Sequence, residues 1–401
     1  MSRYIVLKAV LVSLVVILLV SCGDSDNPAG SKNAKLITWW KTFGGDGGDL
    51  GRAVVAVDDG YVITGSTTSI GSGADDIFLL KIDTLGNMLW EYAYGGPASE
   101  QGNALVAAPD GGFVIAGSTK SSGAGGMDVC LIKTDAAGNW LWERTFGGEN
   151  FETAQGLATT ADGGYILTGW TSSFYATMSE VYVIKTDESG NLQWQRTYGG
   201  SWAEEGAGII QTADGGYIVA GQTESFGAGE DDIYVIKTDE FGNVEWEKTH
   251  GGAGNDWAEA IVAADDGGYV MAGWTGSFGS GGFDAMLLKI NGSGNSVWWK
   301  AYGRAEYDAG NALAKTADGG YVLGGYLGLA GGGADAYLVK VDGSGNILWE
   351  QVYGDNREMA EAVIQTADGG YLLIGQWISP DGENSDIFVI KTDETGNVDT
   401  E

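Results

Sequence analysis

The sequence is poor in the residues that build disulfide frameworks and transition-metal sites. Its 401 residues include two cysteines and one histidine. Because Cys22 is assigned below to another role, a disulfide framework and a cysteine metal site are both excluded. Cys130 lies in the apolar segment 128–132 and is expected to be a small buried side chain. His250 stands where most related segments have Tyr or Phe, so we interpret it as a packed strand residue.

Basic residues are also scarce. The chain has 21 Lys and Arg against 54 Asp and Glu, which gives a formal net charge of -33. Such a balance disfavours nucleic-acid binding, which depends on neutralising phosphates. About half of the acids recur at repeated positions, so much of the charge belongs to the architecture. The remainder suits a soluble extracellular surface.

The N-terminal segment has the pattern of a secretory signal. Arg3 and Lys8 precede an apolar run over 9–20, and Ser21-Cys22 follows. The sequence Leu-Val-Ser-Cys at 19–22 resembles the lipobox of bacterial lipoproteins. This resemblance implies that Cys22 is acylated and becomes the mature N-terminus. The alternative is an ordinary signal peptide with an incidental cysteine.

Three segments follow from this interpretation. Residues 1–22 are the expected signal and lipobox, and residues 23–35, rich in Gly, Ser, Asn and Asp, are a flexible tether. Residues 36–401 form the folded domain. We therefore expect a protein of the cell envelope that is held on a membrane outside the cytoplasm by lipid, at the outer membrane or the cell surface.

One motif returns along the folded domain at steps of 51 or 52 residues. Self-similarity at this period is the signature of a repeat architecture. Its tryptophan recurs at seven positions, which are Trp39, Trp90, Trp142, Trp194, Trp246, Trp298 and Trp349.

The repeat over 206–252 predicts four short strands. Residues 207–211, 217–222 and 232–238 are mostly apolar, and 244–250 alternates apolar and polar residues as a half-exposed outer strand does. Gly-rich turns separate them. Four strands joined in sequence form one antiparallel sheet, and such sheets repeated around an axis form a β-propeller.

The ends of the domain predict how the ring closes. After Gly396 and Asn397 the sequence has no tryptophan and no fourth strand, whereas residues 36–43 form a fourth strand without the three that should precede it. We therefore expect the N-terminal strand to complete the last blade, which removes open sheet edges. The prediction is an all-β, seven-bladed propeller with four antiparallel strands per blade.

The repeat also carries a family resemblance. The unit Ile-Lys-Thr-Asp-x-x-Gly-Asn-x-x-Trp, seen at 236–246, resembles the tryptophan-docking motif of quinoprotein-type propellers. The full repeat is similar to a family of secreted bacterial and archaeal propellers, some of them labelled Kelch-like or endoglucanase-like. This resemblance covers 36–397 and implies the fold and the packing of each tryptophan between blades. The Kelch spacing does not fit, the Trp-Asp dipeptide of WD repeats is absent, and no vicinal cysteines or metal ligands indicate a quinone.

Because the strands of each sheet are antiparallel and joined in sequence, two kinds of loop lie on the same face of the ring. One kind joins the outer strand of a blade to the first strand of the next blade, and the other joins the second strand to the third. They are longer and more variable than the turns of the opposite face, so binding is expected there. Two rings of carboxylates belong to this face. One ring precedes the first strands: Asp49, Glu100, Glu152, Glu204, Asp256, Asp308 and Glu358. The other precedes the third strands: Asp76, Asp128, Glu180, Asp232, Asp284, Asp335 and Asp386.

These rings have two interpretations. Carboxylates in such numbers suit calcium coordination or the paired acids of glycoside hydrolysis. Alternatively, each carboxylate accepts backbone N–H groups of its own or the next blade. Sevenfold repetition favours this second interpretation, because catalysis needs one site and architecture needs all seven. We assign no catalytic residue, metal ligand or cofactor, and leave calcium open.

Function is expected where the sevenfold symmetry breaks. Aromatic residues at such positions suit stacking on sugar rings or cation–π capture of amines, although they would also serve to pack loops together. The candidate ligand-binding residues are Phe151, Trp202, Trp257 and Tyr307 in the loops before first strands, Trp170 and Trp274 at the ends of second strands, and the neighbouring acids Glu204 and Asp256. Tyr326 and Trp377 occupy positions related to Trp170 and Trp274.

Three functions remain open from the sequence. The first is a non-catalytic binding or scaffold propeller for a glycan, a peptide or an envelope partner. The second is a polysaccharide-active enzyme that uses the loop carboxylates. The third is an assembly factor that resembles the lipoprotein propeller of the outer-membrane protein assembly machinery, which has a different blade count.

Overall fold

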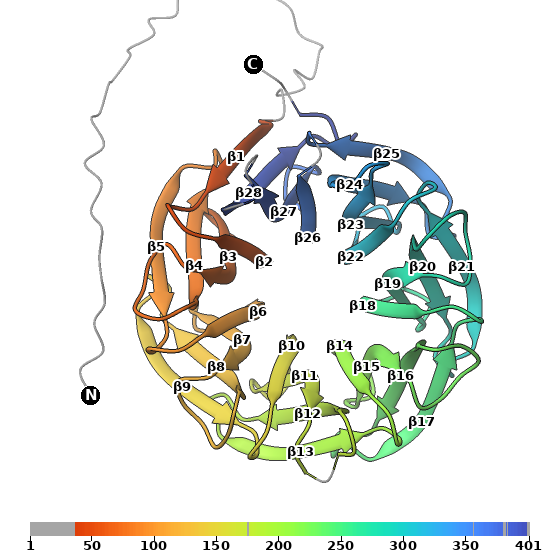
Figure 1. Cartoon of the computed structure of the whole chain (residues 1–401), viewed down its shortest axis with the longest axis horizontal. Coiled ribbons are helices and arrows are strands. Elements are labelled where there is room, and N and C mark those ends of the chain that lie inside the picture. Colours follow the sequence, from red (N-terminus) through yellow and green to blue (C-terminus); the bar gives the residue numbers. More distant parts are fainter. Residues whose placement is uncertain (1–36, 175, 356, 380–381, 383, 399–401) are drawn as a thin grey trace, which may run out of the picture.

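The computed structural model describes residues 37–398, apart from 175, 356, 380–381 and 383. These residues form 28 strands in seven four-stranded antiparallel sheets around a central channel (Figure 1). The predicted seven-bladed β-propeller is confirmed. The expected signal peptide, Cys22 and the tether lie outside the described residues. No helix within the described ranges is long and apolar enough to cross a membrane.

Each blade runs from an inner strand at the channel to an outer strand on the rim. The inner strands are β2 (Asp49–Val57), β6 (Glu100–Ala107), β10 (Glu152–Thr159), β14 (Glu204–Gln211), β18 (Asp256–Ala263), β22 (Asp308–Lys315) and β26 (Glu358–Gln365). The second strands are β3 (Gly60–Thr67), β7 (Phe113–Thr119), β11 (Tyr165–Thr171), β15 (Tyr217–Thr223), β19 (Tyr269–Thr275), β23 (Tyr321–Gly328) and β27 (Tyr371–Ile378).

The third and outer strands complete the blades, which we number 1 to 7 from β2 onward. The third strands are β4 (Asp76–Asp83), β8 (Asp128–Thr134), β12 (Glu180–Thr186), β16 (Asp232–Thr238), β20 (Asp284–Ile290), β24 (Ala334–Val341) and β28 (Ser385–Thr392). The outer strands are β5 (Met88–Tyr94), β9 (Trp140–Phe146), β13 (Leu192–Tyr198), β17 (Val244–His250), β21 (Ser296–Tyr302), β25 (Ile347–Tyr353) and, in blade 7, β1 (Trp39–Phe43).

The N-terminal strand closes the ring as predicted. In blade 7 the strand order is β1-β28-β27-β26, and β1 is antiparallel to β28, with Trp39 opposite Lys391 and Phe43 opposite Ile387. The strand is shorter than the expected segment 36–43. Because β1 covers the edge of β28, the last blade ends in the same way as the other six.

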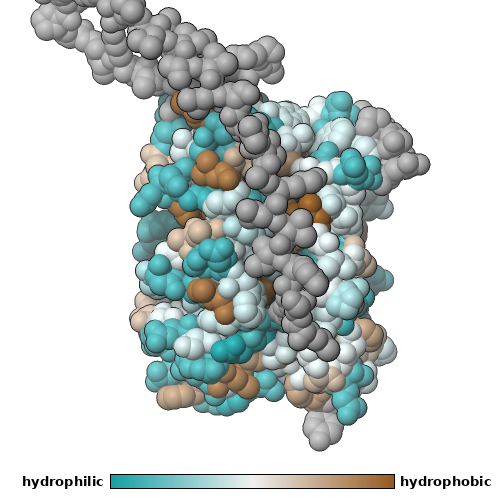
Figure 2. Space-filling view, turned by 90° about the vertical axis from the view of Figure 1, so that its left-hand side faces the viewer, coloured by the Kyte–Doolittle hydropathy of each residue, from teal (hydrophilic) through white to brown (hydrophobic). Residues whose placement is uncertain are grey.

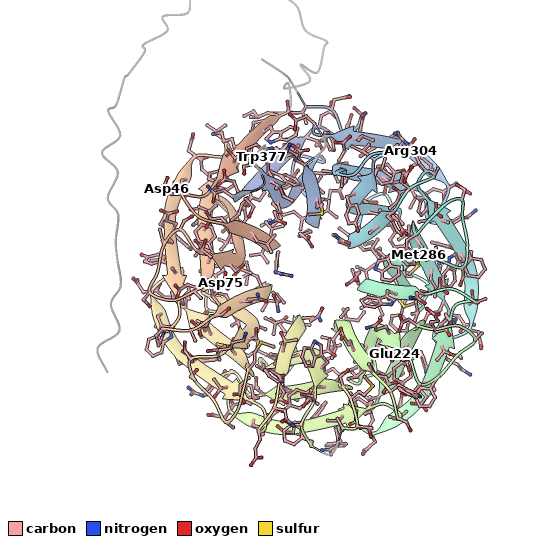
Figure 3. All side chains as sticks on the ribbon, in the orientation of Figure 1. Asp46, Asp75, Glu224, Met286, Arg304 and Trp377 are labelled. Carbon is pink, nitrogen blue, oxygen red and sulfur yellow. The ribbon has the colours of Figure 1, made fainter. Side chains whose placement is uncertain are left out.

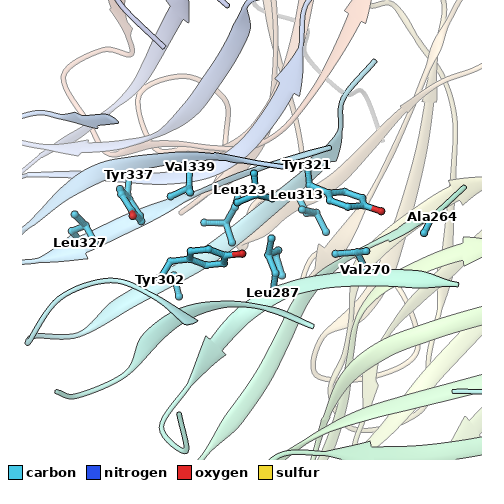
Figure 4. Packing of buried hydrophobic residues seen from close by; sticks show 13 residues of the cluster. Ala264, Val270, Leu287, Tyr302, Leu313, Tyr321, Leu323, Leu327, Tyr337 and Val339 are labelled. Atoms are coloured by element: carbon cyan, nitrogen blue, oxygen red, sulfur yellow. The ribbon is translucent and has the colours of Figure 1, made fainter. Parts of the chain in front are cut away.

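The hydrophobic core consists of seven clusters, each between two neighbouring blades. Figure 4 shows the cluster in which Val270 and Leu287 of blade 5 meet Leu323 and Val339 of blade 6. A similar cluster joins blade 7 to blade 1. Second and third strands are therefore buried on both faces, which explains their continuous apolar sequences. On the side shown in Figure 2, hydrophobic residues stand singly among hydrophilic ones, as is normal for a protein surface.

The repeated tryptophan links each blade to the next. Trp246, on the outer strand of blade 4, lies against Gly294, in the turn between the third and outer strands of blade 5. A Cβ at Gly294 would stand 2.6 Å from the Trp246 ring. The same contact occurs at all seven blade interfaces, through Trp39–Gly86, Trp90–Gly138, Trp142–Gly190, Trp194–Gly242, Trp246–Gly294, Trp298–Gly345 and Trp349–Gly396.

Many of the acids are part of the framework. In every blade, a lysine of the third strand forms an ion pair of 2.6 to 3.0 Å with an aspartate in the turn between the first and second strands. In blade 4, a hydrogen bond from Thr212 and the contact with Lys237 together lower the pKa of Asp214 to about 2. Asp214 is therefore ionised at neutral pH, and the ion pairs join the turns to the third strands.

The docking contact predicts a difference between two glycines of blade 5. Gly294 and Gly267 have almost the same positive φ, 78° and 79°, but a Cβ at Gly267 would have no neighbour within 4 Å. Gly267→Ala should cost about 1 kcal/mol of unfolding free energy through backbone strain alone. Gly294→Ala should cost about 1–3 kcal/mol more, because the methyl group overlaps the Trp246 ring. Urea denaturation of both variants measures the difference, and equal losses would contradict the docking role.

Candidate functional site

The longer loops of neighbouring blades interlock on one face of the ring. The Glu152 amide donates to Met127 O at 2.7 Å, and the Ser172 amide donates to Phe151 O at 2.9 Å. The first bond joins blade 3 to blade 2, and the second joins two loops within blade 3. The loops before the first strands and the loops before the third strands therefore lie on the same face, which we call the loop face.

The carboxylates that precede the first strands are buried and accept hydrogen bonds from loop amides and from threonine hydroxyls. Glu152, which is 0% exposed, accepts 2.7 Å hydrogen bonds from the Gly148 amide and the Thr171 hydroxyl. In the other ring, Asp232 accepts from the amides of Ala228 and Gly229. These contacts agree with the interpretation that the carboxylates of the two rings accept backbone N–H groups of the loops. Within the described ranges, no group of three or more His, Cys, Asp or Glu side chains is arranged to hold a metal ion.

Glu204 and Asp256, which the sequence analysis names as candidate ligand-binding residues, belong to this buried set. Both are 0% exposed. The Gly200 amide donates to Glu204 at 2.7 Å, and the Gly252 amide donates to Asp256 at 2.9 Å. Their role in the structure is to fix the loops that carry the aromatic candidates.

Four aromatic rings form a continuous row across blades 5 and 6. Trp257 and Trp274 stand opposite each other on β18 and β19, with ring centroids 4.7 Å apart. Trp274 contacts Phe283 at 4.5 Å, and Phe283 contacts Tyr307 at 5.4 Å. The row ends at Tyr307, which is 61% exposed.

Tyr307 borders a hollow of about 620 Å³ between blades 6 and 7. Its wall is mainly apolar, and Arg357 lies at its edge, where its guanidinium donates to Ser379 O at 2.6 Å. Glycines at 331–333 line one side and contribute no side chain. The apolar lining residues are Tyr307, Tyr326, Leu329, Ala334, Met359 and Ile378.

The remaining aromatic candidates lie outside this row of four rings. Phe151 and Trp202, on the loops before β10 and β14, are exposed. Trp170 lines the central channel. Trp377 lines a smaller hollow together with Trp40. The structure therefore joins Trp257, Trp274 and Tyr307 into one group and leaves Phe151, Trp202 and Trp170 outside it.

A second candidate region is the mouth of the central channel. Side chains of the inner strands project into the channel (Figure 3). Every inner strand has a bulge where its pairing with the second strand shifts register, for example between Ala154 and Gly156 in blade 3. The extra residue points away from the ladder. The residues at the bulges are Arg52, Asn103, Gln155, Ala207, Glu259, Asn311 and Glu361.

These seven residues line a cavity of about 460 Å³, together with Gln101, Ser118, Met127, Thr153 and Trp170. The walls of this cavity are charged. Burial raises the pKa of Glu361 to about 7, against the opposing effect of Arg52. Outside the lining, burial and repulsion from Glu259 raise the pKa of Glu205 to about 7. Burial also raises the pKa of Glu259, and its contact with Trp274 acts in the opposite direction.

The channel residues did not emerge from the sequence analysis, although a signal was present. Three positions after each carboxylate of the first ring, the residue type changes from blade to blade, while the position before it is always Gly or Ala. The only histidine of the chain, His250, is half-buried on β17, and burial lowers its pKa. It does not lie in either candidate region.

Comparisons with known proteins support the fold. No protein-family model matches the chain. A segment is 27% identical over 156 residues to the regulatory protein FlaEY of Caulobacter vibrioides, a match that covers 33% of this chain and 16% of that protein. The chain therefore spans far less than two thirds of that relative.

Solved structures of similar shape include the WD40 domain of Pan2 from Neurospora crassa, with a TM-score of 0.53, 11% identity, and coverage of 91% of this chain and 97% of that domain. The polysaccharide lyase Uly1 is similar with a TM-score of 0.51, 11% identity, and coverage of 92% and 94% of the two chains. At this identity both show the propeller fold alone. The resemblance to secreted repeat propellers stays a prediction.

The raised pKa of Glu205 predicts a pH-dependent stability. The folded state binds this proton more tightly than the unfolded state, so the contribution of Glu205 is most favourable below its ordinary pKa of 4.5 and is lost as the pH rises to about 7. Glu205→Gln should therefore stabilise the protein at pH 8 and have little effect at pH 4.5. Urea denaturation at both pH values measures this, with the exposed Glu240→Gln as control. An effect of equal size at both pH values would be inconsistent with the channel electrostatics.

Proposed function

We propose that this chain is a non-catalytic binding propeller of the cell envelope, and that its loop face recognises a glycan. The observation that carries the proposal is the exposed Tyr307 ring beside an apolar hollow of about 620 Å³. A hollow of this size is typical of small-ligand sites. Most large aromatic side chains of the protein are packed in blade interfaces, so an exposed ring at the edge of a hollow is a surface suited to stacking.

The surroundings of Tyr307 suit a sugar ring. Phe283 supports the Tyr307 ring from the side, and Trp274 and Trp257 support Phe283 in turn. Because the row is packed, Tyr307 needs little reorganisation to receive a ligand. The apolar face of a sugar would lie on the ring, while Arg357 and Glu306 at the edge of the hollow offer hydrogen bonds to its hydroxyl groups.

The alternatives are less well supported. An apolar peptide side chain would also fill the hollow, but the exposed Tyr307 ring at its edge favours a ligand that stacks. Polysaccharide hydrolysis by the two carboxylate rings would need accessible acids, and those of the ring before the first strands are buried, as Glu204 and Asp256 illustrate. An assembly role in the envelope rests on the family resemblance alone.

Exposure of Tyr307 predicts which substitutions affect binding. Tyr307→Ala should weaken glycan binding about fivefold or more, because aromatic stacking contributes about 1 kcal/mol. Its melting temperature should barely change, since the ring is 61% exposed. The matched control is Phe241→Ala, which removes a ring that is 59% exposed in a turn on the opposite face.

A glycan array identifies the ligand, and titration of the best glycan against both variants gives the affinities. A parallel assay for released sugar ends tests for hydrolysis. Equal affinity of the parent and Tyr307→Ala for every bound glycan would overturn the placement of the site. Hydrolysis would overturn the non-catalytic assignment.

The location in the envelope rests on Cys22. Cys22→Ala should abolish acylation and leave either unprocessed precursor or a protein released from the membrane. Metabolic labelling with a fatty acid and fractionation of membranes measure both effects. A variant that stays with the membrane after signal cleavage, from a parent that takes up no lipid label, would show that the lipobox interpretation is wrong.

A further inference from the structure

The wall of the central channel departs from the sevenfold symmetry of the framework. Bulges direct one side chain from every inner strand into it, and these side chains differ in chemistry around the ring. Arg52 lies in blade 1, amides follow in blades 2 and 3, and Glu259 and Glu361 lie in blades 5 and 7. A repeated framework needs none of this variation, so the variation points to a ligand that is itself asymmetric.

Two buried polar atoms of the channel wall lack hydrogen-bond partners among the described residues. The Arg52 Nε atom is buried and has no hydrogen-bond partner among the described residues, and the same holds for Asn103 Oδ1. The positive charge of Arg52 acts to lower the pKa of Glu361, but the two side chains form no ion pair within the described part of the chain. Unpaired buried donors and carboxylates are unfavourable, so a ligand that supplies both an anion and a cation would stabilise this arrangement.

The size and composition of the cavity restrict the ligand further. About 460 Å³ is enough for one small organic molecule. The side chains present do not form a metal site within the described residues. The nearby amides Asn103, Gln155 and Asn311 offer both donors and acceptors, as a polar molecule requires.

We propose that the mouth of the central channel is a second ligand site, which binds a free amino acid or a short peptide as a zwitterion. The carboxylate of the ligand pairs with Arg52, and its ammonium group pairs with Glu361 and Glu259. The channel amides bind the rest of its polar groups. This site is independent of the glycan site proposed beside Tyr307.

The ionisation of Glu361 predicts how binding depends on pH. Its side chain faces Arg52 from β2, Glu259 from β18 and Tyr326 from β23. With a pKa of about 7, Glu361 must lose a proton to pair with an ammonium group. Affinity should therefore rise from pH 6 to pH 8, by up to about tenfold per unit below the pKa.

The test uses the full chain and calorimetric titration at pH 8 with L-alanyl-L-alanine and the common amino acids. Two blocked dipeptides serve as matched ligands, one with an acetylated amino group and one with an amidated carboxyl group. We expect each blocked form to bind at least about tenfold more weakly than the free dipeptide. Arg52→Gln should abolish the preference for a free carboxylate, and Glu361→Gln should abolish the preference for a free ammonium group.

Three control variants separate this site from the rest of the surface. Arg304→Gln and Glu149→Gln remove exposed charges of the same kinds and should leave binding unchanged. Tyr307→Ala should also leave it unchanged, which separates this result from that of the glycan site. No binding by any zwitterion up to about 10 mM, or equal binding of free and blocked dipeptides, would overturn the proposal, as would glucose binding as tightly as the dipeptide.

Discussion

The whole ring depends on one contact, which is the stacking of an outer-strand tryptophan on a glycine turn of the next blade. The contact requires a residue without a side chain in the left-handed region, and φ at all seven glycines lies between 73° and 80°. The contact recurs at all seven blade interfaces and fixes the angle between neighbouring blades. The turns between third and outer strands, on the face opposite the loop face, therefore have nearly the same geometry. The loop face and the channel wall lie outside this contact, and both candidate regions are found there.

The sequence was sufficient to predict the fold because each repeat carries the same local signals. The blade count, the strand order and the closing strand followed from the period and from the missing strand at each end. The face that holds Trp257 and Tyr307 was predictable as well. The channel was not, because the variable position three residues after each ring carboxylate shows its role only once the pairing of two strands places a bulge there. From the sequence alone, Arg52 and Glu361 therefore cannot be distinguished from ordinary surface charges.

The acidic composition has two physical meanings in this protein. Aspartates such as Asp214 pair with a lysine in every blade, and ring carboxylates such as Glu152 and Asp232 accept hydrogen bonds from backbone amides. The number of these acids reflects the number of blades. Glu361 of the channel forms no ion pair among the described residues, and burial raises its pKa to about 7. Net charge alone does not distinguish these two kinds of acid.

The pairing of β1 with β28 also affects the order in which parts of the protein fold. Among the described strands the first pairs with the last, so β1 has no strand partner until β28 has been synthesised. Contacts at such a sequence separation form slowly, because a long loop must close before they are made. Blades 1 to 6 contain all of their own strands and have no such delay. Ring closure is therefore expected to limit the rate of folding, and a chain interrupted before its last blade would expose an unpaired strand at each end.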